Sequence, residues 1–348
     1  MSSLGENVAA WQQAVFAKDF VIGPGPDQRQ CAEDEVVIDV AYVGIAPSEW
    51  KIQDMAYIEL TYPHVIGTDA AGVVVRVGSK VTRFKAGDRI MGYCLGLVYG
   101  GAKHGAFQLF TTLRERVAAK LPNTMSLSRA VVLPMAISTS SVGLFDILRL
   151  RMPRLNPRPS GETVVIWGAS SSTASVAIQL ACAAGYEVVT TASRHNYGYA
   201  KDLGAARVFD YADVDVIGSI LGYLAGKKLA GVFDCIGEER TTLACASILE
   251  HCGGGTIATV LWPPNALPAS VRAEMVWAFL PGTADAYIAA PVWTDFVTPA
   301  LEIGLLLPQP EAHILTGGLA RLQEALNLQK QGVSASKIVV EIDGIGEL

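Results

Sequence analysis

Runs of β-branched residues alternate with helical segments from residue 163 onward, and this alternation constrains the fold more than any other feature. Strands are predicted at 163–169, 186–193, 206–211, 229–237 and 254–262. Helices are predicted between them, at 175–185, 196–205 and 241–252. Strands that alternate with helices form a parallel sheet covered on both faces. The second half of the chain is therefore predicted to be a doubly wound α/β domain.

The first 120 residues have a different character, because their apolar runs are short and separated by glycine-rich turns. Strands are predicted at 35–45, 72–78, 89–92 and 105–113, which favours a small barrel or sandwich. An apolar helical stretch follows at 126–148, and then a connector rich in proline and arginine. The tail, 318–342, has the pattern of an amphipathic helix followed by a last strand.

Composition excludes several classes of protein. With 51% hydrophobic and 17% charged residues, the chain has the balance of a folded globular protein. Its net charge of −6 gives no electrostatic reason to expect a nucleic-acid partner. The N-terminal segment lacks the basic and apolar regions of a secretory signal, and we expect no membrane span and a cytoplasmic location. The cysteines are scattered, which favours free thiols: Cys31, Cys94, Cys182, Cys235, Cys245 and Cys252.

The turn after the strand at 163–167 is the predicted phosphate site. A glycine and a run of hydroxyl side chains lead there into a helix: Gly168, Ser170, Ser171, Ser172 and Thr173. The N–H groups at a helix N-terminus bind dinucleotide pyrophosphates. Of the usual Gly-x-Gly-x-x-Gly pattern only the first glycine is present, so the alternative is a serine-rich helix cap without a ligand.

The end of the next strand indicates the cofactor. NAD enzymes carry an acid there for the ribose 2′-hydroxyl. This chain instead has Ser193, Arg194, His195, Asn196 and Tyr197. Ser193 and Arg194 suit a 2′-phosphate, which favours NADPH over NADH. The alternative is a solvated surface arginine.

Several motifs occur in the order of a known family: GTDAAGVV at 67–74, FKAGDRI at 84–90, AIQLA at 177–181, DLGA at 202–205 and SKIVV at 336–340. Together they resemble the medium-chain dehydrogenase/reductase superfamily. The resemblance implies a GroES-like domain of residues 1–155 and 296–348. It also implies a Rossmann domain of residues 156–295.

The chain departs from this superfamily's zinc enzymes at the metal-ligand positions. Ala46 stands where those enzymes have a cysteine, and Thr68 and Asp69 stand where they have histidine and glutamate. The four-cysteine lobe of a structural zinc is also missing, since only Cys94 lies in that region. His64 and His104 alone do not form a tetrahedral site. We therefore expect no metal.

Within the zinc-independent members, four segments resemble the trans-acting enoyl reductases of fungal polyketide synthases: 47–51, 193–196, 208–211 and 233–236. The resemblance implies NADPH-dependent reduction of an α,β-unsaturated acyl thioester in secondary metabolism. One alternative is a quinone or alkenal reductase acting on free small molecules. A second is a binding or scaffold protein without redox chemistry, because the glycine turn is eroded.

The resemblance also implies site residues. Lys51 is the expected catalytic group, with a surface lysine as the alternative, and Tyr57 and Tyr62 are further candidate donors. Cofactor contacts are expected from Ser48, Glu49, Trp50, Lys51, Tyr211, Ile236, Val260, Leu261, Ile338 and Val339. Substrate contacts are expected from Met135, Ser138, Thr139, Ser140, Ser141, Val142, Leu280, Pro281 and Gly282.

The connector contains the densest cationic stretch of the chain: Arg149, Arg151, Arg154 and Arg158. A basic loop could guide docking of an acidic acyl carrier domain of a polyketide synthase. The alternative is a solvated linker stiffened by its prolines.

Overall fold

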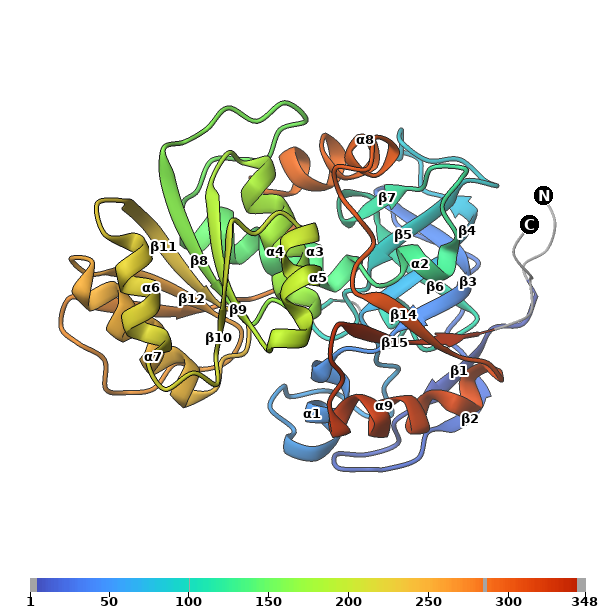
Figure 1. Ribbon diagram of the computed structural model, residues 1–348. Coiled ribbons are helices and arrows are strands. Elements are labelled where there is room, and N and C mark those ends of the chain that lie inside the picture. Colours follow the sequence, from blue (N-terminus) through green and yellow to red (C-terminus); the bar gives the residue numbers. More distant parts are fainter. Residues whose placement is uncertain (1–4, 100, 284–286, 343–348) are drawn as a thin grey trace. The chain divides into compact units, whose positions relative to one another are not determined.

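The computed structural model describes residues 5–99, 101–283 and 287–342 (Figure 1). The chain forms two compact units. Unit 1 consists of residues 1–135 and 311–348, and unit 2 of residues 136–310. The expected domain boundaries were at residues 155 and 296. Residues 136–155 and 296–310 therefore belong to unit 2 rather than to unit 1.

Packing explains both differences. A Cβ atom at Gly143 would lie 2.5 Å from the ring of Phe233, so the helical segment around Gly143 packs directly on the sheet of unit 2. The second segment is tied to a helix of the same unit. The side chain of Gln179 accepts a hydrogen bond from the backbone N–H of Leu307 at 2.7 Å and donates one to its carbonyl at 3.3 Å.

The sheet of unit 2 is parallel throughout its described strands, with the order β10-β9-β8-β11-β12-β13. Its strands are β8 (Glu162–Trp167), β9 (Glu187–Ala192), β10 (Arg207–Asp210), β11 (Lys228–Asp234), β12 (Gly255–Thr259) and β13 (Val271–Met275). The predicted doubly wound parallel sheet is confirmed. The edge strand β13 was not predicted, because its apolar positions alternate with Arg272 and Glu274 and give only a short pattern.

Helices α4 (Ser172–Ala183) and α5 (Tyr197–Asp202) lie on one side of this sheet, and α6 (Val216–Leu224) and α7 (Glu239–His251) on the other (Figure 1). Apolar side chains of α6 and α7 form one core with the central strands, because both helices turn their buried faces toward β8, β9, β11 and β12. Further helical segments of unit 2 are α8 (Val297–Glu302), η4 (Arg194–Asn196), η5 (Leu280–Gly282) and η6 (Ala290–Thr294).

Unit 1 is built on a sheet with the order β14-β15-β3-β4-β5-β7, with β6 paired to β3. Its strands are β3 (Glu35–Gly44), β4 (Asp69–Val77), β5 (Arg89–Tyr93), β6 (Phe110–Arg114), β7 (Ala118–Lys120), β14 (Glu311–Leu315) and β15 (Ser336–Glu341). A hairpin of β1 (Val8–Trp11) and β2 (Val21–Pro24) precedes it. The helical segments are α1 (Pro47–Met55), α9 (Leu322–Gln331), η1 (Gly101–His104), η2 (Glu115–Val117) and η7 (Gly318–Arg321).

The strand predicted at 105–113 begins only at Phe110. The residues before it follow an irregular path, because the Gln108 amide donates a hydrogen bond to the carbonyl of Gly105 at 2.6 Å. A Cβ atom at position 105 would lie 2.0 Å from the carbonyl oxygen of Val65, so only glycine fits there.

The apolar helical stretch comprises α2 (Leu127–Ala130), α3 (Pro134–Ser141) and the π-helix η3 (Val142–Ile147). By length and composition, residues Leu127–Ile147 could cross a membrane, but 83% of their apolar window is buried inside the structure. Packing in the protein interior therefore accounts for their apolar character.

Candidate active site

The turn between β8 and α4 has the geometry of an anion site. Gly168 has φ of +90°, and a Cβ atom there would lie 2.6 Å from the Ile236 side chain, so glycine is required. Ser171 caps α4 by accepting a hydrogen bond from the N–H of Ala174 at 3.1 Å. The half-buried Ser170, Ser172 and Thr173 surround the first turn. The first turn of a helix presents N–H groups without helical partners, which suits a pyrophosphate.

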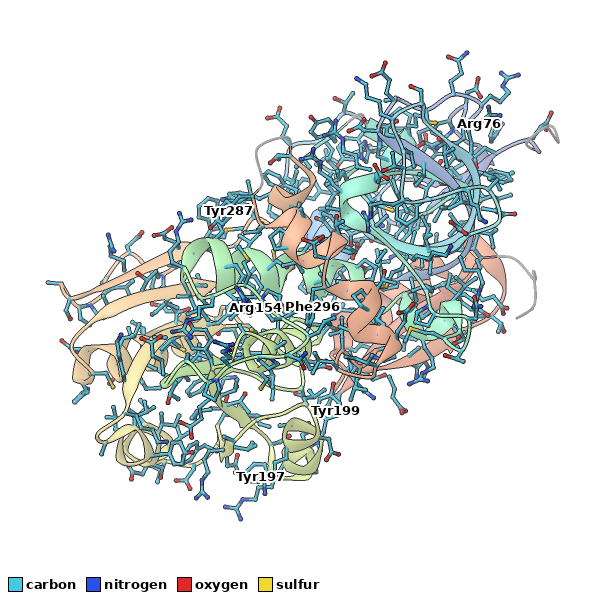
Figure 2. All side chains as sticks on the ribbon, turned by 90° about the horizontal axis from the view of Figure 1, so that it is seen from above. Arg76, Arg154, Tyr197, Tyr199, Tyr287 and Phe296 are labelled. Carbon is cyan, nitrogen blue, oxygen red and sulfur yellow. The ribbon has the colours of Figure 1, made fainter. Side chains whose placement is uncertain are left out.

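The end of β9 leads into the short helix η4, which carries the predicted 2′-phosphate residues. The Asn196 side-chain amide donates a hydrogen bond to the Ser193 hydroxyl at 3.3 Å. The same hydroxyl is 3.3 Å from His195 Nε2. Tyr197 begins α5, and Tyr199 follows two residues later (both are labelled in Figure 2). The Tyr199 hydroxyl is 2.7 Å from that of Ser175. These residues are thus brought together by the chain's local turn.

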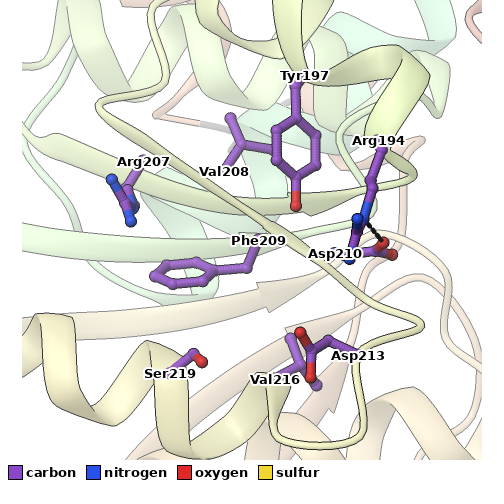
Figure 3. A pocket seen from close by; sticks show the side chains of 9 residues that line it. All are labelled: Arg194, Tyr197, Arg207, Val208, Phe209, Asp210, Asp213, Val216 and Ser219. Atoms are coloured by element: carbon purple, nitrogen blue, oxygen red, sulfur yellow. Dashed lines mark hydrogen bonds and ion pairs between the residues drawn. The ribbon is translucent and has the colours of Figure 1, made fainter.

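Arg194 lies at the rim of a pocket of about 360 Å³ that is also lined by Tyr197, Arg207 and Asp210 (Figure 3). The Arg194 Nε–H donates to the Asp210 carboxylate at 3.0 Å, although the arginine side chain is 80% exposed. Sequence reasoning did not identify this partner. The sequence feature that could have indicated this partner is that Asp210 ends β10, the strand that pairs in parallel with β9. This hydrogen bond at Nε orients the planar guanidinium group of Arg194, and with it the two terminal nitrogens.

The remaining predicted cofactor residues of unit 2 follow the carboxyl ends of parallel strands, where such sheets bind ligands. Tyr211 follows β10, Ile236 follows β11, and Val260 and Leu261 follow β12. The turn after β11 is held by Asp234, which sequence reasoning missed. Its buried carboxylate accepts hydrogen bonds from the backbone N–H groups of residues 236 and 237 at 3.1 and 3.0 Å, and from the hydroxyls of residues 241 and 242 at 2.8 Å each.

The predicted substrate residues of unit 2 lie on α3, η3 and η5. Thr139 and Val142 are buried on α3 and η3, and Leu280, Pro281 and Gly282 form η5. The hydroxyls of Ser140 and Ser141 donate to the carbonyls of Thr173 and Ile137, at 2.9 and 2.5 Å. The Ser138 hydroxyl is buried and has no hydrogen-bond partner in the described part of the chain, and the same holds for Thr259 at the end of β12. Buried hydroxyls without a protein partner call for an explanation, and a ligand contact is one candidate for these two.

In unit 1, a buried polar network occupies the positions of the superfamily's zinc ligands. Glu49 accepts hydrogen bonds from the Thr68 hydroxyl at 2.8 Å and from the N–H of Ala46 at 2.7 Å. Asp69 accepts from the Lys337 ammonium at 2.7 Å and from the N–H of Met135 at 2.5 Å. Asp69 is fully buried and Lys337 is 4% exposed, so this is an ion pair of the protein interior.

Burial raises the pKa of the Glu49 carboxyl to about 7, although the nearby charge of Lys337 and the Thr68 hydroxyl act in the opposite direction. Both oxygens of this carboxyl already accept hydrogen bonds, one from the Thr68 hydroxyl and the other from the Ala46 N–H.

The residues in this region do not fit a zinc ion. The side chain of Ala46 has no atom that can bind a metal. The Thr68 hydroxyl donates a hydrogen bond to Glu49, and Asp69 is already paired with the Lys337 cation. His64 Nε2 lies 3.0 Å from the Gly96 carbonyl, and His104 Nε2 lies 2.7 Å from a Glu35 carboxylate oxygen. No group of three potential metal ligands occurs among residues 5–99, 101–283 and 287–342.

Helix α1 carries the predicted residues 48–51. The Ser48 hydroxyl is 3.8 Å from the sulfur of Met135, and the half-buried Lys51 has its ammonium 5.6 Å from the centre of the Trp50 ring. Ile338 and Val339 are buried in β15, directly after Lys337. Of the alternative donors, Tyr57 is 40% exposed, and the Tyr62 hydroxyl is buried without a partner in the described structure.

The comparisons with known proteins cover both units. The family model "Alcohol dehydrogenase GroES-like domain" matches residues 32–123, and "Zinc-binding dehydrogenase" matches residues 173–277. The chain is 42% identical to the trans-enoyl reductase himH of Aspergillus japonicus, over 97% of each chain. It is 29% identical to lovC of Aspergillus terreus, the enoyl reductase component of lovastatin nonaketide synthase, over 89% of this chain and 90% of that protein.

Among solved structures, an alcohol dehydrogenase superfamily protein from Novosphingobium aromaticivorans is similar with a TM-score of 0.80. It is 24% identical, and the match covers 97% of this chain and 100% of that one. At this identity the likeness supports the fold alone.

The buried ion pair leads to a stability prediction. Replacing Lys337→Met keeps the volume of the side chain but leaves the Asp69 carboxylate buried without its cation. We expect the free energy of unfolding, measured by urea denaturation, to fall by about 3–5 kcal/mol. Replacing Asp69→Asn in addition should recover part of this loss, because it removes the uncompensated charge.

The matched control is Lys228→Met, which breaks the exposed ion pair with Glu162 and should shift the urea midpoint little. Equal losses in the Lys337 and Lys228 variants would contradict the assignment of Asp69–Lys337 as an interior pair.

The raised pKa of Glu49 leads to a prediction about pH. The native state binds a proton at Glu49 between about pH 4.5 and pH 7, where the unfolded chain has released it. The unfolding free energy should therefore fall as the pH rises through this window. Replacing Glu49→Gln removes this component, so the difference in unfolding free energy between wild type and variant should change with pH across the window.

Urea denaturation at several pH values measures that difference. The exposed replacement Glu59→Gln serves as the control, and its difference from wild type should stay constant. A constant difference for Glu49→Gln as well would show that this carboxyl titrates normally.

Proposed function

Because the chain belongs to the medium-chain dehydrogenase/reductase superfamily, we propose that it is an NADPH-dependent enoyl reductase that acts in trans with a polyketide synthase. It would reduce the carbon–carbon double bond of an α,β-unsaturated acyl thioester. The observation that carries the proposal is that Ala46 has no atom that could bind a metal, while Thr68 and Asp69 are already engaged with Glu49 and Lys337. Reduction of a conjugated double bond needs no Lewis acid at this place, unlike alcohol oxidation. The full-length similarity to a trans-enoyl reductase supports the same reaction.

The residues of unit 2 fit a dinucleotide. Gly168 and the N-terminus of α4 would hold the pyrophosphate, and Ser193 and Arg194 would bind the 2′-phosphate of NADPH. When bound, NADPH supplies the hydride for the β-carbon of the acyl group. The residues after β11 and β12 would flank the cofactor, because Asp234 fixes the turn that carries Ile236.

The remaining chemistry concerns the carbonyl oxygen and the proton. Negative charge that develops on the thioester carbonyl must be stabilised by hydrogen-bond donors. The buried hydroxyls of Ser138 and Thr259 are proposed for this role, because each lacks a partner in the described part of the chain. Lys51 is proposed to hold a proton for the α-carbon or to stabilise the same charge. Residues 139–142 and 280–282 would position the acyl group.

The arginine-rich connector is proposed as the docking loop for an acidic carrier domain. Arg149 is engaged within unit 2, since its guanidinium donates to the Tyr287 hydroxyl at 2.6 Å and to Asp146 at 3.2 Å. Arg151, Arg154 and Arg158 have exposed side chains, so they are the cations that a partner could reach. Arg154 is labelled in Figure 2. The name of lovC, a component of a polyketide synthase, supports such a partner.

Cofactor preference provides one test. Replacing Arg194→Ala should raise the dissociation constant of NADPH by about 5–100-fold, as expected for loss of a charge-assisted hydrogen bond, and leave that of NADH nearly unchanged. Binding can be measured by titration calorimetry. The control is Arg240→Ala, which removes an exposed arginine that pairs with Glu238 in the same unit. Equal affinities of the wild-type protein for NADPH and NADH would refute the preference.

Turnover provides the test of the reaction. Oxidation of NADPH should be rapid with trans-2-enoyl thioesters and slow with quinones and free alkenals. Activity should survive dialysis against a chelator, and elemental analysis should find no stoichiometric zinc. Faster turnover of quinones or alkenals would favour a reductase of free small molecules, and NADPH binding without any turnover would favour a scaffold protein.

A further inference from the structure

Three aromatic side chains form a connected row on unit 2. The rings of Trp262 and Trp277 are 5.6 Å apart and nearly perpendicular, and those of Trp277 and Phe279 are 5.7 Å apart. We call these three residues the aromatic ladder. Trp262 is 67% exposed and Trp277 is 37% exposed, so the ladder is not part of the core. Aromatic side chains that cluster at an exposed place are typical of binding sites.

The ladder stands at the carboxyl ends of two adjacent parallel strands. Trp262 comes three residues after β12, and Trp277 comes two residues after β13. The N–H of Val276 donates to the carbonyl of Thr259 at 2.8 Å, which continues the strand pairing up to the ladder. Because ligands of such sheets bind beyond the carboxyl ends of the strands, the ladder faces the region where a ligand is expected.

The ladder is also continuous with the proposed site. Leu261 directly precedes Trp262 and packs closely on the turn after β11, since a Cβ atom at Gly237 would lie 2.8 Å from the Leu261 backbone nitrogen. Phe279 is followed directly by Leu280–Gly282, the segment proposed to contact the substrate. The orphaned hydroxyl of Thr259 lies at the end of β12, three residues before Trp262.

We infer that the aromatic ladder is the subsite for the apolar distal part of the acyl chain, and that the enzyme is specific for long or conjugated acyl thioesters. The inference rests on the proposed function. The thioester and its double bond must stay at the cofactor, so a longer acyl chain has to continue away from the strand ends. Aromatic rings bury methylene groups and stack on conjugated double bonds without hydrogen bonding. Each buried methylene favours binding by about fourfold.

The main test compares chain lengths. The kcat/KM values for the trans-2-dodecenoyl and trans-2-butenoyl thioesters of N-acetylcysteamine are measured for the wild type, Trp262→Ala and Trp277→Ala. We expect the ratio of the longer to the shorter substrate to fall about 10–50-fold in both variants, mainly through KM. The control is Ile303→Ala, another exposed apolar residue of unit 2 that lies after α8. It should keep the wild-type ratio. An unchanged ratio in both tryptophan variants would overturn the inference.

A binding measurement separates failure of this inference from failure of the proposed function. In the presence of NADP⁺, the saturated dodecanoyl thioester should shift the tryptophan emission of the wild type to shorter wavelength, because the acyl chain displaces water from the exposed Trp262. Trp262→Phe should lose part of that shift. An emission shift without any turnover of enoyl thioesters would support the subsite and refute the reaction. Turnover without a chain-length effect or an emission shift would support the reaction and refute the subsite.

A second copy of this chain is the competing occupant, because β13 is an edge strand beside the ladder. Analytical ultracentrifugation of the wild type and Trp262→Ala distinguishes the two. A wild-type dimer that dissociates in the variant would assign the ladder to an interface between copies and overturn the substrate inference.

Discussion

The ion pair between Asp69 and Lys337 is the contact on which unit 1 depends. It joins β4, near the start of the chain, to β15, near its end, and neither residue has solvent to stabilise its charge. An interior charge is tolerated only when its partner is held in good geometry. Asp69 also accepts a hydrogen bond from the backbone of Met135, and the adjacent Thr68 bonds to Glu49 at the start of α1. One polar cluster therefore fixes a strand, a helix start and the returning tail together.

The same cluster explains why the residues at the superfamily's zinc-ligand positions do not fit a zinc ion in this chain. A zinc site needs several deprotonated donors that converge on an empty space. Here the Lys337 ammonium compensates the buried Asp69, and the Thr68 hydroxyl donates a hydrogen bond to Glu49, whose carboxyl pKa is raised. At this position the charge of Asp69 is compensated by Lys337, a cation of the protein's own tail.

Periodicity predicted most strands of the parallel sheet, including the short β10 and β12, and it missed β13 and α1. The strands around residues 35–44 and 162–167 and the helices α4 and α7 have apolar patterns long enough to be recognised. Strand β13 alternates over only five residues, and α1 begins with a proline and has mixed polarity, so neither gave a signal. In the candidate site, the glycine turn and the hydroxyl run were visible in the sequence. The partnership of Arg194 with Asp210 and the support of a turn by Asp234 were not, because each joins positions that only folding brings together.

The discontinuity of unit 1 has a consequence for how the protein is made. During synthesis, residues 1–135 emerge from the ribosome before residues 311–348. Strands β3 and β4 are therefore complete while β15 is still to be synthesised. During that interval Asp69 lacks its cation, and the edge of β3 that β15 will occupy is open. Unit 2 has no such gap in sequence and has all of its strands once residue 310 has emerged. In a nascent chain, unit 2 should therefore fold before unit 1, although the synthesis of unit 1 begins first. The first unit then closes last, when its final strand arrives.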